Sequence, residues 1–333
     1  MNTTFSYCRR GVALLTALAT FVSCSIQRPL YGSRAEAIAA QIQNPASEYV
    51  VVACHRGDWR NYPENSIPAI ESIIRMGADM MELDIKMTAD SVLVLSHDKD
   101  VLRCTNFSSV FRKQPGKSPL IKDLTYSEIK QLRLKRAHGV VTDSLHMPTL
   151  REALACCKGR ICVNVDQGYA YYDRVQALAE ELGMTGQVLI KGRATVAEVR
   201  EKEAAYPNKL LYMPIVEIQQ NAGMRLFKSY LEQGAVPLAY EVCWRSNGDG
   251  LFREVCRQIR EQGSKIWVNT IWASLCGGYG NDDDAAFEAD DPGRVYRQYL
   301  DLGVSMLQTD RPALLIGYLT RQGRHTLPPF QHK

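Results

Sequence analysis

The chain has 333 residues, a hydrophobic content of 46%, a charged content of 23% and a formal net charge of +4. This is the composition of an ordinary globular protein, long enough for one α/β barrel with additions or for two small domains. No sustained basic run accompanies the small positive charge, so no nucleic-acid partner is indicated.

The first 24 residues predict an export signal. Arg9 and Arg10 precede a short apolar run over residues 11–22, and this run lacks the roughly 20 residues that a membrane-spanning helix needs. The segment Phe21-Val22-Ser23-Cys24 resembles a bacterial lipobox, so we expect Cys24 to be lipidated. An ordinary secretory signal that is cut nearby is the alternative. In both cases we expect an exported bacterial protein, either periplasmic or anchored to a membrane surface as a lipoprotein.

The rest of the chain divides into three parts. We predict a tether over residues 25–48, a folded domain over 49–322 and a short tail over 323–333. In the folded domain, short β-branched or aliphatic runs alternate with longer stretches of helical period, which is typical of a parallel α/β sheet. The predicted strands cover 49–55, 80–87, 92–97, 160–166, 187–191, 210–216, 237–243, 265–271 and 305–309. The predicted helices cover 67–76, 150–157, 172–182, 195–206, 223–234, 250–262 and 293–302.

The predicted strands number one more than an eight-stranded barrel needs. Strand 92–97 follows strand 80–87 so closely that a parallel crossover is excluded, whereas a hairpin fits. We therefore predict a (β/α)8 TIM barrel with a β-hairpin excursion after the second strand. If Thr88 and Ser91 close the hairpin, His97 lies opposite Glu82 on the same face of the ribbon. A slip of one residue in the register would break this expectation.

Polar side chains recur where the predicted strands end, which is where a barrel places its active site. Glu82 and Asp84 are two positions apart on one strand, so their side chains share a face. Their charges repel each other unless a proton or a cation lies between them, and such oxygen ligands suit Mg²⁺ or Ca²⁺. Plain ion pairs with Arg56 or Lys86 are the alternative. The strand-end residues are His55, Arg56, Glu82, Asp84, Asp166, Lys191, Glu241 and Asp310.

These residues fall in ordered segments that resemble the glycerophosphodiester phosphodiesterase family. The similarity covers about residues 50–320 and is strongest in the first third. It implies a TIM barrel of the phospholipase-C-like phosphodiesterase type, which hydrolyses glycerophosphodiesters to an alcohol and glycerol phosphate with one divalent cation. The segments are His55-Arg56-Gly57, Pro63-Glu64-Asn65-Ser66, Gly77-Ala78-Asp79, Glu82-Leu83-Asp84-Ile85, Thr88, Asp90, His97-Asp98, Arg103-Cys104-Thr105-Asn106, Met147-Pro148-Thr149-Leu150-Arg151-Glu152-Ala153, Gly303-Val304 and Thr309-Asp310-Arg311-Pro312.

Carried over position by position, the resemblance implies that His55 and His97 are the acid–base pair of this reaction. Glu82 and Asp84 would bind the cation, either Mg²⁺ or Ca²⁺, and Arg56 would bind the substrate phosphate. The expected partners are therefore a small phosphodiester substrate and, through the lipid anchor, a membrane surface.

The third metal-ligand strand departs from the family pattern. Asp166 stands where the family has a glutamate, and Gly168 stands where it has a phosphate-binding lysine. We expect Asp166 to remain the third metal ligand. We also expect Lys191, which ends the neighbouring strand, to return the missing charge, although a lysine that snorkels out of the sheet is the alternative. Three carboxylates, one divalent cation and Arg56 sum to zero charge, so Lys191 would balance the phosphodiester.

Three further residues, Glu64, Glu241 and Trp267, are predicted to support the site. Glu64 could equally begin the helix that follows it, and Trp267 could equally pack in the core. The acidic run over residues 282–284 is expected to be a solvated loop.

Two other functions stay open at this point. One is the same chemistry on another phosphodiester, such as a lysophospholipid, a glycerophosphoinositol or a wall polymer, and the departures at Asp166 and Gly168 favour it. The other is a catalytically idle barrel that binds phospholipid head groups. The presence of both histidines and of two family metal ligands argues against the idle barrel.

Overall fold

The computed structural model of the chain describes residues 30–137, 139–245, 249–272 and 279–331. The predicted signal segment with Cys24 and the first residues of the predicted tether lie outside this part of the chain. No helix within the described ranges combines the length and the apolar character that crossing a membrane requires.

Eight parallel strands of the described chain close into a barrel, since β1 pairs with β2 on one side and with β9 on the other. The predicted fold class is therefore confirmed, and each predicted strand ends within two residues of an observed one. The barrel strands are buried on both faces, as is usual for parallel strands that are covered by helices. The barrel strands are β1 (Val51–His55), β2 (Met80–Met87), β4 (Cys162–Asp166), β5 (Val188–Gly192), β6 (Leu211–Glu217), β7 (Ala239–Cys243), β8 (Lys265–Asn269) and β9 (Met306–Thr309).

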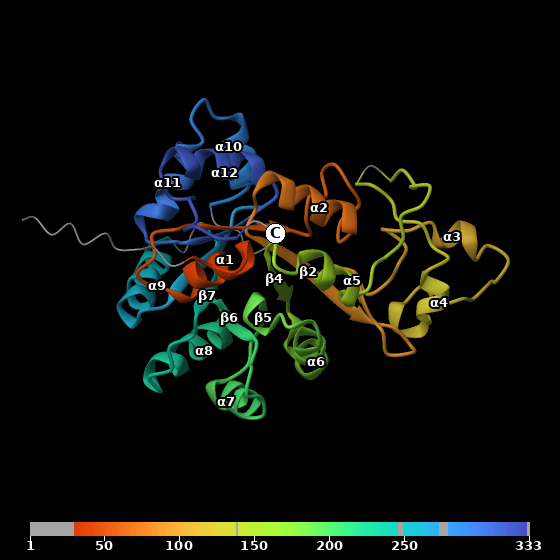
Figure 1. The fold of residues 1–333 in the computed structure, drawn as a ribbon, viewed down its shortest axis with the longest axis horizontal. Coiled ribbons are helices and arrows are strands. Elements are labelled where there is room, and N and C mark those ends of the chain that lie inside the picture. Colours follow the sequence, from red (N-terminus) through yellow and green to blue (C-terminus); the bar gives the residue numbers. More distant parts are fainter. Residues whose placement is uncertain (1–29, 138, 246–248, 273–278, 332–333) are drawn as a thin grey trace, which may run out of the picture.

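Helices surround the barrel (Figure 1). The sequence missed α12, although Pro312 at its first position is typical of a helix start. The longer helices are α2 (Ile67–Met76), α5 (Leu150–Cys157), α6 (Tyr172–Leu182), α7 (Val196–Ala204), α8 (Asn221–Glu232), α9 (Asp249–Gln262), α10 (Asp282–Glu288), α11 (Gly293–Asp301) and α12 (Pro312–Arg321). Short 3-10 helices are η1 (Ile121–Asp123), η2 (Gly168–Tyr171) and η3 (Thr185–Gln187).

The hairpin after β2 is present, but its register differs by one residue from the prediction. Thr88 pairs with Val92 through backbone and side-chain hydrogen bonds, so the turn closes one residue later than expected. β3 (Leu93–Leu95) then pairs with β2 through Ile85 and Leu95. The expected cross-strand pair of His97 with Glu82 is therefore wrong, and His97 lies in the loop beyond β3.

Beyond β3, residues 96–137 and 139–148 form a small unit beside the barrel (Figure 1). Together with β3 they enclose a separate apolar cluster. It contains α3 (Phe107–Val110) and α4 (Tyr126–Ile129). The buried members of its cluster are Val94, Val101, Phe107, Phe111, Ile121, Leu124, Ile129, Leu132, Leu134 and Met147. The hairpin excursion is thus a packed unit that carries His97 at its base.

The described part of the predicted tether packs against the barrel instead of extending from it. It forms α1 (Arg34–Gln43), and Ile38 and Ile42 of this helix are fully buried against residues of the barrel interior. Arg34 donates hydrogen bonds to the backbone carbonyls of Gly77 and Ala78. This stretch packs on the barrel because its apolar residues recur at helical spacing, so that one face of the helix buries against the open end of the barrel.

The predicted tail is also part of the fold. His325 stacks on Tyr49 at 5.0 Å between ring centroids, and Phe330 pairs with Tyr31 in a short bridge. The two chain segments outside the predicted domain boundaries therefore hold each other at the end of the barrel where α1 lies.

We predict that Ile38→Ala destabilises the protein by about 2–5 kcal/mol, because the substitution leaves a cavity under α1. The measurement is thermal unfolding, with an expected fall in Tm of about 5–15 °C. Leu30→Ala in the same segment is the control, since Leu30 is 63% exposed. If residues 30–48 were only a tether, both variants would unfold at the temperature of the wild type.

Candidate active site at the carboxyl ends of the strands

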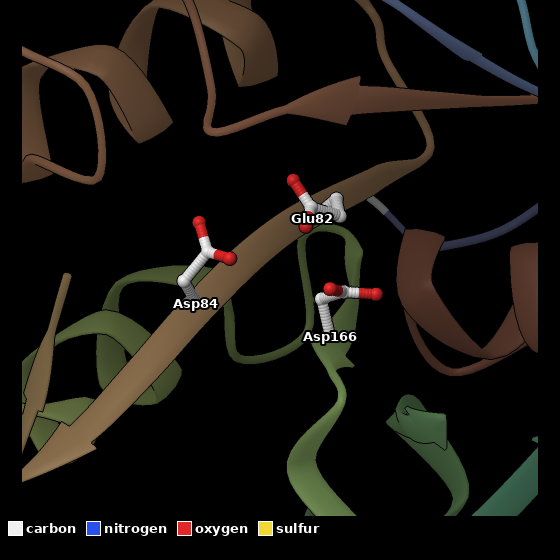
Figure 2. Close-up of side chains that lie close together, drawn as sticks. All are labelled: Glu82, Asp84 and Asp166. Atoms are coloured by element: carbon white, nitrogen blue, oxygen red, sulfur yellow. The ribbon is translucent and has the colours of Figure 1, made fainter. Parts of the chain in front are cut away.

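Glu82, Asp84 and Asp166 form a carboxylate cluster, with one oxygen from each residue within 4.8 Å of the others. Glu82 and Asp84 come from β2 and Asp166 from the end of β4 (Figure 2). The strand register pairs Asp84 directly with Asp166. Burial and the two neighbouring carboxylates raise the pKa of Glu82 well above its usual value. These hard oxygen donors fit Mg²⁺ or Ca²⁺, which would relieve the repulsion among them.

His55 ends β1 and is oriented by a carboxylate. Its Nδ1 lies 2.9 Å from Asp310 Oδ1, and Trp59 Nε1 donates to the same oxygen at 2.7 Å. The Trp272 ring packs against the imidazole in a T-shaped arrangement, with 5.5 Å between the ring centroids. If Nδ1 carries the hydrogen that Asp310 accepts, Nε2 is the nitrogen available for proton transfer.

A buried carboxylate, Asp283, holds Asp310 in turn. It accepts from the Asp310 backbone N at 2.6 Å and from the Thr309 hydroxyl at 2.8 Å, and burial raises its pKa to about 7. The prediction of a solvated acidic loop is therefore wrong for Asp282 and Asp283, which are buried in α10. Hydrogen-bond donors from β9 and its neighbours make that burial possible.

His97 is 43% exposed and is linked to the barrel through a chain of alternating charges. Its Nδ1 lies 2.7 Å from Asp98, and Asp98 accepts from Arg103 Nε at 2.6 Å. Arg103 then binds Glu64 through both terminal nitrogens, at 2.6 and 2.8 Å. Burial alone would raise the pKa of Asp98, but the hydrogen bonds from Arg103 and His97 outweigh it and lower this pKa to about 2. The predicted supporting role of Glu64 corresponds to this contact between the excursion and the barrel.

Arg56 lies between that chain and the carboxylate cluster. Its Nη1 donates to Glu64 at 3.2 Å, and its Nε lies 3.6 Å from Asp84 Oδ2. The Arg56 backbone N donates to Glu82 at 2.9 Å, in a left-handed conformation with φ of 55°. Asn65 adds a hydrogen bond of 3.0 Å to Asp84. The segment that follows β1 thus holds both carboxylates of β2.

Lys191 points into the barrel as expected but is fully enclosed. Its Nζ lies 3.1 Å from Glu241 Oε2 and 3.6 Å from Asp166 Oδ1. It also lies 4.0 Å from the ring centroid of Trp267. Burial alone would lower the pKa of Lys191, but the negative charges of Glu241 and Asp166 outweigh it and raise this pKa. The structure therefore makes Lys191 a counter-ion of Asp166 and Glu241 beneath the cluster.

The remaining predicted residues divide between the cavity and the core. Glu241 lines the cavity and accepts from Asn269 at 2.8 Å. Trp267 is fully buried below the cavity and donates to Asn269, so it supports the site only through these neighbours.

The cavity has a volume of about 100 Å³ and brings the two histidines, Arg56 and the carboxylate cluster together. Sequence reasoning missed Arg193 as a lining residue, although it lies two positions after Lys191 at the same strand end. The lining residues are His55, Arg56, Glu82, Asp84, His97, Asp166, Gln167, Arg193, Ile215, Glu241, Cys243, Asn269 and Gln308.

The fold is a TIM barrel that brings two histidines and a carboxylate cluster to one cavity at the carboxyl ends of its strands. The family model described as the glycerophosphoryl diester phosphodiesterase family matches residues 55–212, and a model described as a domain of unknown function matches residues 212–319. The part of the barrel that contributes the histidines and the carboxylate cluster is thus similar to the glycerophosphoryl diester phosphodiesterase family.

Curated relatives carry the same family name. A glycerophosphodiester phosphodiesterase from Bacillus altitudinis is 29% identical over 170 residues, which are 50% of this chain and 64% of that protein. Another, from Caldanaerobacter subterraneus subsp. tengcongensis, is 38% identical over 102 residues, which are 31% of this chain and 38% of that protein. This chain therefore spans less than two thirds of the length of either relative.

Solved structures share the barrel over most of its length. A glycerophosphoryl diester phosphodiesterase from Parabacteroides distasonis has a TM-score of 0.67 and 22% identity, covering 88% of this chain and 94% of that one. A phosphodiesterase from Oleispira antarctica, solved in complex with the product sn-glycerol-3-phosphate, has a TM-score of 0.59 and 17% identity, covering 84% and 100%. At these identities the likeness establishes the common fold.

We predict that Asp310→Asn lowers kcat by about 10- to 100-fold, because the amide no longer stabilises a protonated His55. The measurement is phosphodiester hydrolysis across pH, since a loss of that stabilisation also moves the pH profile. Asp301→Asn, at an exposed carboxylate of α11, is the control. An unchanged rate and pH profile in Asp310→Asn would remove Asp310 from the site.

Proposed function

We propose that this protein is a divalent-cation-dependent phosphodiesterase that hydrolyses glycerophosphodiesters to an alcohol and glycerol phosphate. The observation that carries the proposal is one cavity lined by His55, His97 and the cluster of Glu82, Asp84 and Asp166. The family match over residues 55–212 supports the same reaction. The product bound in the Oleispira antarctica phosphodiesterase supports glycerol phosphate as a product here.

One cation, Mg²⁺ or Ca²⁺, is the proposed cofactor, held by the three clustered carboxylates. When bound, it supplies positive charge for the phosphate oxygens. Asp166 is one carbon shorter than a glutamate, but its pairing with Asp84 in the strand register brings its carboxylate to the cluster. Arg56, which lies beside Asp84 and Glu64, binds a phosphate oxygen on the other side.

The two histidines carry the proton transfers. One removes a proton from the attacking water as its oxygen bonds to phosphorus, and the other protonates the leaving alcohol as the ester bond breaks. Where a neighbouring hydroxyl of the substrate attacks instead, a cyclic phosphate forms, and water then opens it to glycerol phosphate. Each imidazole has a carboxylate on Nδ1, Asp310 for His55 and Asp98 for His97. Because these carboxylates stabilise the protonated imidazole, each histidine can accept a proton and return it.

We further propose that the protein is exported and anchored to a bacterial membrane surface through lipidated Cys24. The support is the short apolar run and the lipobox-like segment that follows it. A lipid chain of this kind anchors a protein to the surface without spanning the bilayer. Such a location would place the enzyme near the deacylated remains of phospholipids.

The test is hydrolysis of glycerophosphocholine and glycerophosphoethanolamine by wild type, His55→Ala and His97→Ala, each with EDTA or with added Mg²⁺ or Ca²⁺. We expect each alanine to lower the rate by about 10²- to 10⁴-fold and EDTA to abolish the wild-type activity reversibly. His146→Ala is the matched control, because His146 is an exposed histidine of the same excursion. Equal background rates in all samples would contradict the proposal and favour a barrel that only binds head groups.

A further inference from the structure

Arg193 is a cation of the cavity that has no part in the mechanism described above. It directly follows β5, and its side chain is 46% exposed at the cavity that contains the carboxylate cluster. Its guanidinium binds Glu217, at the end of β6, through Nε at 3.0 Å and through Nη2. The pair therefore joins the ends of β5 and β6 at the solvent side of the site.

The strand register explains why Arg193 reaches this position. β4 and β5 pair Val165 with Ile190, and the same offset places Asp166, the last residue of β4, beside Lys191. The distance of 3.6 Å between Lys191 Nζ and Asp166 Oδ1 agrees with the extended register. Arg193, two residues after Lys191, lines the same cavity from just beyond the end of β5.

No side chain from Gly168 can serve the cavity. A Cβ atom at this position would lie 2.6 Å from Val165 Cγ1 and 3.1 Å from Ile190 Cγ1. Gln167 has a φ of 47°, so the chain turns sharply into η2 directly after the metal-ligand position. A positive charge on this side of the cavity therefore has to come from the neighbouring strand β5.

Arg193 is a second cation of the cavity, besides Arg56, that can meet an incoming anion. Arg56 already contacts Glu64 and Asp84, and Lys191 is enclosed below the cluster by Asp166 and Glu241. Arg193 is half exposed, and its ion-pair partner among the described residues is Glu217. Because the Arg193 side chain is half exposed, solvent weakens this ion pair, and a phosphate can compete for the guanidinium.

We propose that Arg193 binds a non-bridging oxygen of the substrate phosphodiester, opposite Arg56, and gives up part of its ion pair with Glu217 to do so. The proposal rests on the proposed phosphodiesterase function and adds a binding residue to the same site. A planar guanidinium suits this contact because it can donate two parallel hydrogen bonds to a phosphate. Lys191 then neutralises Asp166 and Glu241 from below, while Arg193 meets the phosphate from above.

The experiment measures binding of sn-glycerol 3-phosphate by calorimetry, in the presence of Mg²⁺, and its inhibition of hydrolysis. We expect Arg193→Gln to weaken both by about 10- to 100-fold, as the loss of one charge-assisted hydrogen bond does. Binding of uncharged glycerol should change little. Arg193→Lys should recover part of the affinity, and KM should rise more than kcat falls.

Arg151→Gln is the matched control, because Arg151 makes the same two-pronged bond to Glu181 on the outside of the barrel. Glu217→Gln, which releases Arg193, should bind glycerol phosphate at least as tightly as wild type. Unchanged affinity in Arg193→Gln, or an equal loss for glycerol and glycerol phosphate, would overturn the inference. Thermal unfolding of each variant separates loss of binding from loss of fold.

The two proposals fail in different ways. If the wild type binds glycerol phosphate through Arg193 but hydrolyses no diester, the inference holds and the proposed function fails. If the wild type hydrolyses diesters and Arg193→Gln binds the product as tightly, the function holds and the inference fails. If the wild type does not bind glycerol phosphate at all, the inference is overturned.

Discussion

Repulsion among three carboxylates is the physical constraint on which the rest of the site depends. Glu82, Asp84 and Asp166 present oxygens within 4.8 Å of one another in a largely buried setting. Like charges this close raise each other's cost of ionisation, and burial increases that cost further. The barrel imposes the arrangement because β2 and β4 pair in a fixed register. A cation bound among the oxygens would turn this repulsion into attraction.

The surrounding residues reduce the same repulsion from several sides. Arg56 approaches from the segment after β1, and Lys191 approaches from inside the barrel. Each of these cations is also bound by a second carboxylate, Glu64 or Glu241. The site is therefore an alternating network of charges, in which a single substitution leaves a neighbour without its partner.

The histidines are held by separate networks, and this explains why the fold needs its additions. His55 depends on Asp310, which Asp283 of α10 fixes through the backbone. His97 depends on Asp98 and Arg103, which belong to the excursion after β3. The excursion has its own apolar cluster, so it can present His97 as a packed unit instead of a loose loop.

Much of the fold could be predicted from the sequence because buried parallel strands leave continuous apolar runs. Glu82 and Asp84 could be predicted as a pair because residues two apart on a strand share a face. The enclosure of Lys191 could not be predicted in this way, since it depends on Glu241 and Trp267, which are distant from Lys191 in the sequence.

Features set by tertiary contacts were missed for the same kind of reason. The hairpin register depends on whether Thr88 pairs with Ser91 or with Val92. The residue types in this turn do not distinguish between these two pairings. The segment around Ile38 is short enough to pass for a tether until the open end of the barrel gives it a surface to bury against.

The measurement that tests the central claim most directly is a calorimetric titration of the metal-free protein with Ca²⁺ and Mg²⁺. A cation site formed by the cluster predicts one bound ion per chain, lost in Glu82→Gln and weakened in Asp166→Asn. Asp301→Asn should bind as the wild type does, because Asp301 is exposed on α11. The absence of binding at millimolar cation, or equal binding by wild type and Glu82→Gln, would contradict the account.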